Sequence, residues 1–151
     1  MRNSTLLRSG GSTLAAAALG NAFVKREDVA WLTQLKHPRM QISLPAFFVV
    51  GGLYYVCIGT IVHRSLVRGD QRAHRLALAV LAGNELWNLA FFGRHSTRAG
   101  FVGLLGFSIP VCLLQAALIR DRPAALIFSP YTAWVLCYDL PWTYQLWRLN
   151  P

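Results

Sequence analysis

Charged side chains are scarce in this sequence. Asp, Glu, Lys and Arg make up only 14% of its 151 residues, whereas a soluble domain carries about 25%. Hydrophobic residues account for 54%, and the mean hydropathy is +0.38. Apolar segments recur along the whole length with no polar domain between them. The composition therefore excludes an ordinary soluble domain and predicts one membrane-embedded domain covering residues 1–151.

Acidic residues are especially few, with six Asp and Glu against fifteen Lys and Arg, which gives a formal net charge of +9. Such an excess can indicate a nucleic-acid partner. Here the arginines separate the apolar segments instead of forming one patch, which is typical of membrane-interface anchors. We therefore expect a lipid bilayer as partner and no nucleic acid. Eight basic residues fall on one side of the predicted bundle and seven on the other, so they do not decide its orientation.

Cysteine is also rare. Cys57, Cys112 and Cys137 all lie within apolar segments, and no Cys-x-x-Cys occurs. We expect three small buried side chains and no disulfide framework. The four histidines are scattered over connectors and segment ends, so no metal site or cofactor is predicted.

Five apolar segments are long enough, or nearly so, to cross a bilayer as helices of about 20 residues. The first is short and also resembles a signal peptide, with Arg2 and Arg8 before an Ala-rich run, but we expect it to be retained. The predicted fold class is an all-α integral membrane protein, a multi-pass five-transmembrane-helix bundle in a membrane that the sequence does not specify. The spans are roughly 9–24, 45–66, 73–93, 99–119 and 124–147.

The third span carries polar groups that lipid would disfavour. Asn84, Trp87, Asn88 and Phe91 follow one another at i, i+3, i+4 and i+7, and therefore share one helix face. Polar residues inside a membrane usually face a cavity or a protein partner. This face is a candidate wall of a binding pocket.

The fifth span presents a second aromatic face. Tyr131, Trp134, Tyr138 and Trp142 recur at near-helical steps, and Asp139 lies beside them. An aromatic stripe is more often internal packing than a ligand site. Because the third span offers a matching polar and aromatic face, we favour a pocket between the two spans.

Several motifs resemble the TspO/MBR family, the tryptophan-rich sensory proteins that include the mitochondrial translocator protein. Asn84-x-x-Trp87-x-x-x-Phe91-Phe92-Gly93 resembles the family pattern of the third helix. Pro130-Tyr131-x-x-Trp134-Val135 and the closing Trp147-Arg148-Leu149-Asn150 resemble those of the fifth. Leu53-Tyr54-Tyr55 with Gly59 resembles the second-helix motif, and Gly20-Asn21-Ala22-Phe23-Val24 with Trp31, Leu35 and His37-Pro38 resembles the end of the first helix and its loop.

The resemblance implies a five-helix bundle, usually a homodimer, with a pocket that opens toward the loop between the first two helices. It implies a hydrophobic small-molecule ligand such as a tetrapyrrole, a sterol or an isoprenoid, and a role as sensor or transporter. It also adds Trp31 in the loop and Tyr55 in the second span to the candidate ligand-binding residues. The full candidate set is Trp31, Tyr55, Asn84, Trp87, Asn88, Phe91, Tyr131, Trp134, Tyr138 and Trp142.

The chain departs from the family pattern at two informative places. Gly51 stands where the second helix of the family has a tryptophan that faces the one at Trp134. The glycine serves either close helix packing or a pocket reshaped for a wider ligand. The fifth span has one extra residue, so that Pro141-Trp142 or Trp142-Thr143 stands where the family has a Leu-Asn pair.

Two intramembrane carboxyl groups, Glu85 and Asp139, lie outside the family signature. Each is either a structural hydrogen-bonding group, a contact for a polar ligand tip, or a general acid. An apolar cavity disfavours the charged form of a carboxyl group, and a neutral acid facing aromatic rings suits olefin or epoxide protonation. The alternative function is therefore a membrane-embedded isoprenoid cyclase or isomerase with Glu85 or Asp139 as catalytic acid.

Small residues suggest where helices approach closely. Ala79-x-x-x-Gly83 and Gly100-x-x-Gly103-x-x-Gly106 form small-residue faces on the third and fourth spans. Such faces suit helix–helix contact or dimerisation. We expect Gly83 and Gly103 to lie in a homodimer interface.

Overall fold

The computed structural model describes residues 24–151, and these fold entirely as helices and connectors. The predicted first span at 9–24 lies outside the described residues, apart from Val24. A short helix α2 (Arg26–Gln34) precedes the long helices α3 (Leu44–Arg68), α4 (Gln71–Phe91) and α5 (Thr97–Ala117). The last rod consists of α6 (Arg122–Trp134), the π-helical segment η2 (Val135–Asp139) and α7 (Leu140–Leu149), preceded by a 3-10 turn η1 (Leu118–Arg120).

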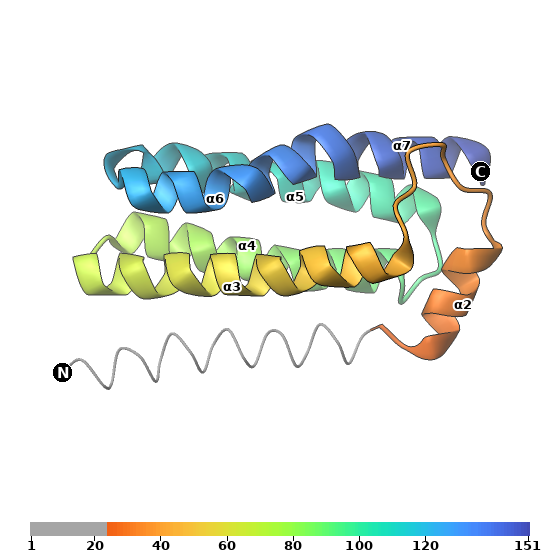
Figure 1. Ribbon diagram of the computed structural model, residues 1–151, viewed down its shortest axis with the longest axis horizontal. Coiled ribbons are helices and arrows are strands. Elements are labelled where there is room, and N and C mark those ends of the chain that lie inside the picture. The colour runs from red at the N-terminus through yellow and green to blue at the C-terminus, as the bar shows by residue number, and fades with distance from the viewer. Residues whose placement is uncertain (1–23) are drawn as a thin grey trace.

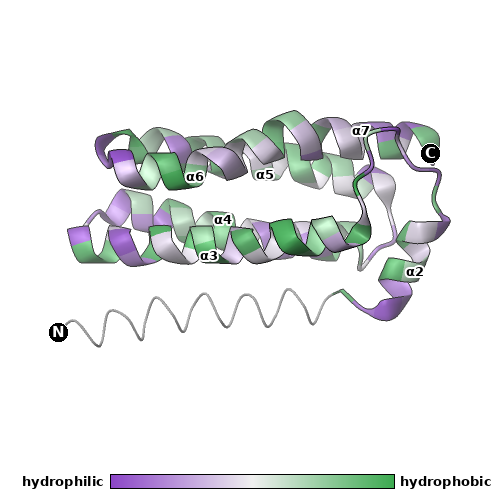
Figure 2. Ribbon diagram, in the orientation of Figure 1, coloured by the Kyte–Doolittle hydropathy of each residue, from purple (hydrophilic) through white to green (hydrophobic). Residues whose placement is uncertain are grey.

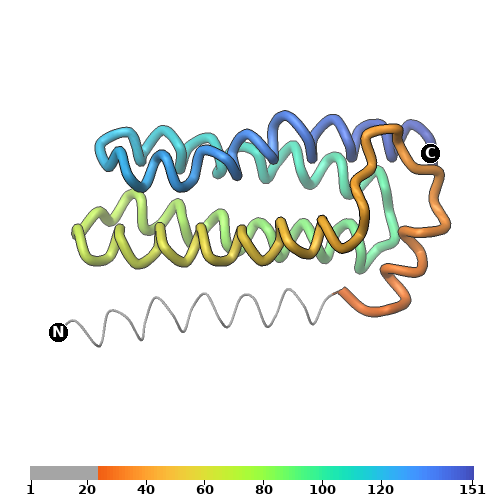
Figure 3. Tube along the Cα trace, viewed as in Figure 1, coloured from red at the N-terminus to blue at the C-terminus, as the bar shows by residue number. Residues whose placement is uncertain are grey.

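The long helices run side by side as a bundle (Figure 1). α3 and α4 form one pair, and α5 packs beside the α6–α7 rod. The largest contact between elements joins α4 to α5. α2 lies across one end of the bundle, at the same end as the C-terminus, as the chain trace shows (Figure 3).

Local sequence signals set the helix ends. Pro45 stands in the first turn of α3, where its missing N–H costs nothing. Gly69 ends the same helix in the left-handed conformation, at φ 68°. The side chains of Asp70 and Ser96 cap α4 and α5 by accepting hydrogen bonds from the backbone N–H groups of Ala73 and Ala99.

Hydropathy divides the bundle into an apolar shaft and polar ends (Figure 2). Within residues 24–151, two helices are long and apolar enough to cross a membrane, Leu44–Arg68 and Thr97–Arg120. The predicted spans at 73–93 and 124–147 overlap α4 and the α6–α7 rod. α4 is more polar, with Arg72, His74 and Arg75 in its first turns, and the rod is divided into three shorter elements.

The core has two parts. The larger lies along the bundle and includes Ile58, Val80, Leu114 and Phe128, all fully buried. The smaller contains Leu32, Phe91, Trp142 and Leu146 and fastens α2 to the end of the bundle.

The cysteines do not follow the expectation of burial. Cys57 is half-buried, and Cys112 and Cys137 are exposed on the surface of the described bundle. In a membrane protein lipid covers an outward face, so an apolar side chain gains nothing from turning inward.

Candidate ligand-binding site

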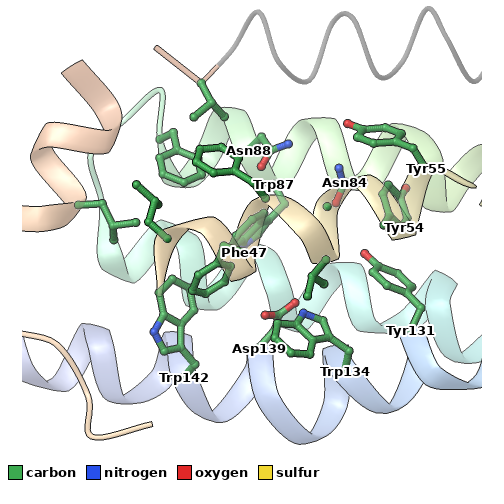
Figure 4. A pocket seen from close by; sticks show the side chains of 18 of the residues that line it. Phe47, Tyr54, Tyr55, Asn84, Trp87, Asn88, Tyr131, Trp134, Asp139 and Trp142 are labelled. Atoms are coloured by element: carbon green, nitrogen blue, oxygen red, sulfur yellow. The ribbon is translucent and has the colours of Figure 1, made fainter. Parts of the chain in front are cut away.

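A cavity of about 420 Å³ lies between α2, α3, α4 and the α6–α7 rod. Figure 4 shows side chains from these elements converging on it. Its size is within the range of small-molecule sites, about 300–1,000 Å³. The lining residues are Val24, Val29, Leu32, Leu44, Phe47, Phe48, Val50, Gly51, Gly52, Tyr54, Tyr55, Asn84, Trp87, Asn88, Phe92, Tyr131, Trp134, Asp139 and Trp142.

Aromatic side chains account for nine of the nineteen lining residues. The ring of Phe47 on α3 lies 6.3 Å from that of Trp134 and 5.1 Å from that of Trp142, centroid to centroid. Tyr54 and Tyr131 close another side, with ring centroids 4.6 Å apart. A planar or isoprenoid hydrophobe would therefore meet aromatic faces from two sides.

The polar atoms at the cavity come from few residues. Asn84 and Asn88 on α4 face it, as the helical spacing of that span predicted. Asp139 faces it from the opposite rod, beside the indole of Trp134 (Figure 4). These groups can orient a ligand whose body is apolar.

Glu85 occupies a different place from Asp139. Its Oε1 atom accepts a hydrogen bond from the Tyr55 hydroxyl at 2.6 Å and a longer one from the Asn84 amide at 3.3 Å. Its Oε2 atom is buried and has no hydrogen-bond partner among the described residues. Glu85 does not line the cavity, so only Asp139 has the position that acid catalysis on a ligand requires.

Three candidate residues lie behind the cavity wall. Phe91 is fully buried and stacks on Trp87 with ring centroids 5.3 Å apart. Trp31 contacts the edge of Phe91 at 5.3 Å and stacks on His95 at 4.9 Å. Tyr138 stacks on Trp134 at 4.3 Å, and its hydroxyl accepts a hydrogen bond from the backbone N–H of Ile42.

The backbone explains why Asp139 lines the cavity and Tyr138, which the sequence placed there, does not. The sequence placed Tyr138 on the aromatic face and Asp139 beside it, on the assumption of regular α-helical steps. The π-helical turn η2 alters the rotation per residue between Trp134 and Leu140. Asp139 consequently faces the cavity, and Tyr138 turns toward the connector before α3.

Helix α2 covers one end of the cavity with Val29 and Leu32. It is held there by Asp28, which is buried. Its carboxylate accepts hydrogen bonds from the backbone N–H of Lys25 and from Nε2 of His95, both at 2.7 Å. Burial raises the pKa of Asp28, but these hydrogen bonds and the charge of His95 outweigh it and hold the pKa below its ordinary value.

The connector between α2 and α3 is fixed to the last rod. Gln41 accepts a hydrogen bond from the indole N–H of Trp142 at 2.6 Å. Asn150 accepts from the backbone N–H of Lys36 and donates to its carbonyl, both at 3.0 Å. Trp142 and Asn150 of the last rod thus fix the connector that joins α2 to α3.

The glycines separate into two groups. Gly51 and Gly52 line the cavity, and a Cβ atom added at either would meet no atom of residues 24–151 within 4 Å. This open space favours the reshaped pocket over close packing at Gly51. The large aromatic that the family pattern has at this position is absent, and Phe47, one turn earlier, supplies the aromatic wall.

Gly83, Gly100 and Gly103 lie where α4 and α5 contact each other within the chain, with Gly100 buried and the other two partly buried. A Cβ atom on Gly83 would lie 2.8 Å from the ring of Phe107, and one on Gly103 would lie 3.4 Å from Trp87. One on Gly100 would collide with the ring of Phe91. The small residues allow α4 and α5 to approach each other within one chain.

The sequence reasoning missed the part of the site that α2 and the start of α3 contribute. Phe47, Gly51, Tyr54 and Tyr55 follow i, i+4, i+7 and i+8 spacing on one face of α3. That periodicity was available in the sequence and would have added Phe47. Leu32 and Val29 carry no such signal, because their role depends on where α2 docks. Among residues 24–151 no cluster of His, Cys, Asp or Glu could hold a metal ion.

The apolar shaft, the helical bundle and the aromatic cavity define an all-α integral membrane protein with an internal ligand-sized site. A sequence model of the TspO/MBR family matches residues 11–148, and the chain belongs to this family. The predicted family and its five-helix membrane fold are thereby confirmed.

Two characterised relatives are similar along most of their length. Tryptophan-rich protein TspO of Chlorobaculum tepidum is 27% identical over 97% of this chain and 96% of its own. Protein CrtK of Rhodobacter capsulatus is 29% identical over 81% of this chain and 79% of its own.

Proposed function

We propose that this protein binds a hydrophobic small molecule in the described cavity and acts as a membrane sensor or transporter of that molecule. The observation that carries the proposal is the cavity itself, with aromatic walls and a few polar atoms. This combination is typical of small-molecule sites, where apolar surface supplies affinity and polar atoms fix orientation. Family membership supports the membrane role.

The proposed ligand classes are a tetrapyrrole, a sterol or an isoprenoid. The aromatic pairs Phe47–Trp142 and Tyr54–Tyr131 suit a flat or branched hydrocarbon body. Gly51 removes a wall that a tryptophan would provide and leaves room for a bulky ligand.

The proposed contact residues are the seven candidates that line the cavity. Phe91 and Tyr138 act at one remove, because each packs against a lining residue, Trp87 and Trp134 respectively. Trp31 packs in turn against Phe91. The seven are Tyr55, Asn84, Trp87, Asn88, Tyr131, Trp134 and Trp142.

A ligand titration tests the proposal. The full chain in lipid nanodiscs is titrated with protoporphyrin IX, cholesterol and geranylgeraniol while tryptophan fluorescence is measured. We expect saturable binding of at least one, weakened by Trp134→Phe. Trp147→Phe is the matched control, because Trp147 stacks on Phe101 at 5.5 Å outside the cavity. The proposal fails if all three ligands partition without saturation and both variants behave like the parent.

A homodimer remains a proposal that rests on the resemblance to the family. Gly83 and Gly103 contact aromatic side chains of the same chain but are only partly buried, so their place in a dimer interface stays a prediction. Light scattering on the detergent-solubilised protein tests it, and a monomer mass at all concentrations would contradict it.

A further inference from the structure

The last rod contains an unusual turn where it meets the cavity. In η2 the backbone N–H of Leu140 bonds to the carbonyl of Val135, five residues back. Such a π-helical turn takes up one more residue than an α-helical turn and often occurs at functional sites. The turn widens the rod between Trp134 and Leu140, beside the cavity.

The turn changes which side chains share a face. In a regular α-helix, five residues rotate the side chain by about 500°, which would point Trp134 and Asp139 about 140° apart. The wider turn reduces this divergence. Figure 4 shows the Asp139 carboxyl group and the Trp134 indole together at the cavity.

Asp139 has no cationic partner in the part of the chain that the structure describes. The ion pairs there are Lys25–Glu27, Arg64–Asp121, Arg68–Asp121 and His95–Asp28. Asp139 lies ten residues before the end of α7 at Leu149, roughly 15 Å along the helix axis. The described lysines and arginines lie in connectors or near helix ends.

A carboxylate in an apolar site is costly unless an opposite charge or hydrogen bonds compensate it. The indole of Trp134 lies beside the Asp139 carboxyl group (Figure 4). The surroundings of Asp139 also supply aromatic faces, from Phe47, Trp134 and Trp142. Aromatic faces attract cations through the ring quadrupole, most strongly where water is excluded.

From this geometry we infer that Asp139 is the counter-ion for a cationic nitrogen of the ligand. The cavity then takes an amphiphile with an apolar body and an amine or quaternary ammonium group, held between the carboxylate and the rings of Trp134 and Phe47. The inference rests on the proposed binding function and adds cationic amphiphiles to its ligand classes. It gives η2 a role, because this turn directs the carboxylate toward the cavity.

A matched pair of probes tests the inference. The probes are 4-phenylbutyl-trimethylammonium and the uncharged compound in which a carbon atom replaces the nitrogen, so that shape is kept and charge removed. The full chain in phosphatidylcholine nanodiscs is titrated with each by calorimetry, and the signal from empty nanodiscs is subtracted. We expect the cation to bind about tenfold more tightly, a difference of roughly 1.4 kcal/mol.

Three variants locate the preference. Asp139→Asn should abolish the preference for the cationic probe, while affinity for the uncharged probe stays within about twofold. Asp139→Glu should retain the preference, which a purely structural role would not predict. Glu85→Gln is the control, because it neutralises the other intramembrane carboxyl group, which does not line the cavity, and keeps an acceptor for Tyr55.

The outcomes separate this inference from the proposed function. Equal or tighter saturable binding of the uncharged probe overturns the inference and leaves the binding function standing. Retention of the cation preference in Asp139→Asn, or its loss in Glu85→Gln, also overturns it. If neither probe binds saturably to the parent protein, while protoporphyrin or a sterol does, the cationic ligand class is wrong and the cavity binds neutral or anionic hydrophobes.

Discussion

The Nε2 atom of His95 lies 2.7 Å from the Oδ1 atom of Asp28, although 67 residues separate them in the chain. The contact joins α2, which covers the cavity, to the connector between α4 and α5. His95 has a positive φ of 46°, which is uncommon for a residue other than glycine. Trp31, one turn after Asp28, stacks on the same imidazole at 4.9 Å. The cover of the cavity is thus fastened by a pair of contacts to one histidine.

Removal of the Asp28 charge should loosen α2. In Asp28→Asn we expect amide hydrogen exchange in α2 to rise roughly two- to fivefold at neutral pH, since partly exposed ion pairs contribute up to about 1 kcal/mol. Glu27→Gln is the control, because the Lys25–Glu27 pair is 68% exposed on both sides. Equal exchange in Asp28→Asn and the parent would contradict the fastening role.

The same contact should weaken in acid. The pKa of Asp28 in the folded protein is below its ordinary value of 3.8. Its stabilising contribution is therefore complete above that ordinary value and is lost as the pH falls through the lowered pKa. Titration of Asp28 should therefore leave amide exchange in α2 almost unchanged between neutral pH and about pH 5. Below pH 4 it should increase that exchange. In Asp28→Asn this acid-dependent step should be absent, and its persistence would assign it to another group.

Filling the space at Gly51 should narrow the cavity. An indole adds on the order of 150–250 Å² of surface, and Gly51→Trp would place it opposite Trp134. We expect affinity for bulky ligands to fall about tenfold, the effect of roughly 1.4 kcal/mol of overpacking, while membrane insertion is unchanged. Gly106→Trp is the control, because Gly106 also has open space but does not line the cavity. Misfolding of Gly51→Trp with unchanged ligand preference would show that Gly51 serves packing.

The glycines of α5 should differ in their tolerance of a methyl group. Gly100→Ala places a Cβ atom against the fully buried Phe91, which Trp87, Phe92 and Trp142 surround. We expect a loss of about 1–3 kcal/mol of stability, measured by thermal unfolding in detergent. Gly106→Ala, on the same helix with no atom of the described residues within 4 Å, should be neutral or gain up to about 1 kcal/mol from helix propensity. Similar melting temperatures for both variants would contradict the packing at Gly100.

Asn150 should control the connector before α3. Asn150→Ala removes both hydrogen bonds to Lys36, worth about 1 kcal/mol in total at this exposed position. We expect faster exchange at residues 36–43 and faster ligand dissociation, with the bundle unaffected. Ser129→Ala is the control, because the Ser129 hydroxyl bonds within its own helix, to Leu126. Unchanged exchange at 36–43 would show that the hydrogen bonds of Trp142 to Gln41 and of Tyr138 to Ile42 and Met40 hold the connector without Asn150.

The sequence by itself determined the class of the protein and most of one wall of the site. A low charge content and recurrent apolar segments are enough to predict a helical membrane bundle, because lipid demands that each segment satisfy its own backbone hydrogen bonds. The spacing of Asn84, Trp87 and Asn88 placed them on the cavity side of α4, because α4 is a regular helix and its period is fixed. The ordered motifs identified the family.

Only the tertiary structure decided which groups face the cavity from the other elements. The π-helical turn η2 exchanged Tyr138 for Asp139 at the cavity, and a fixed period of 3.6 residues does not anticipate it. Docking of α2 through Asp28 and His95 depends on residues far apart in the chain. Gly83 and Gly103 have the small-residue pattern of any close helix contact. The spacing does not say whether the contact lies within one chain or between two. In the structure Gly83 on α4 faces α5 and Gly103 on α5 faces α4, within the same chain.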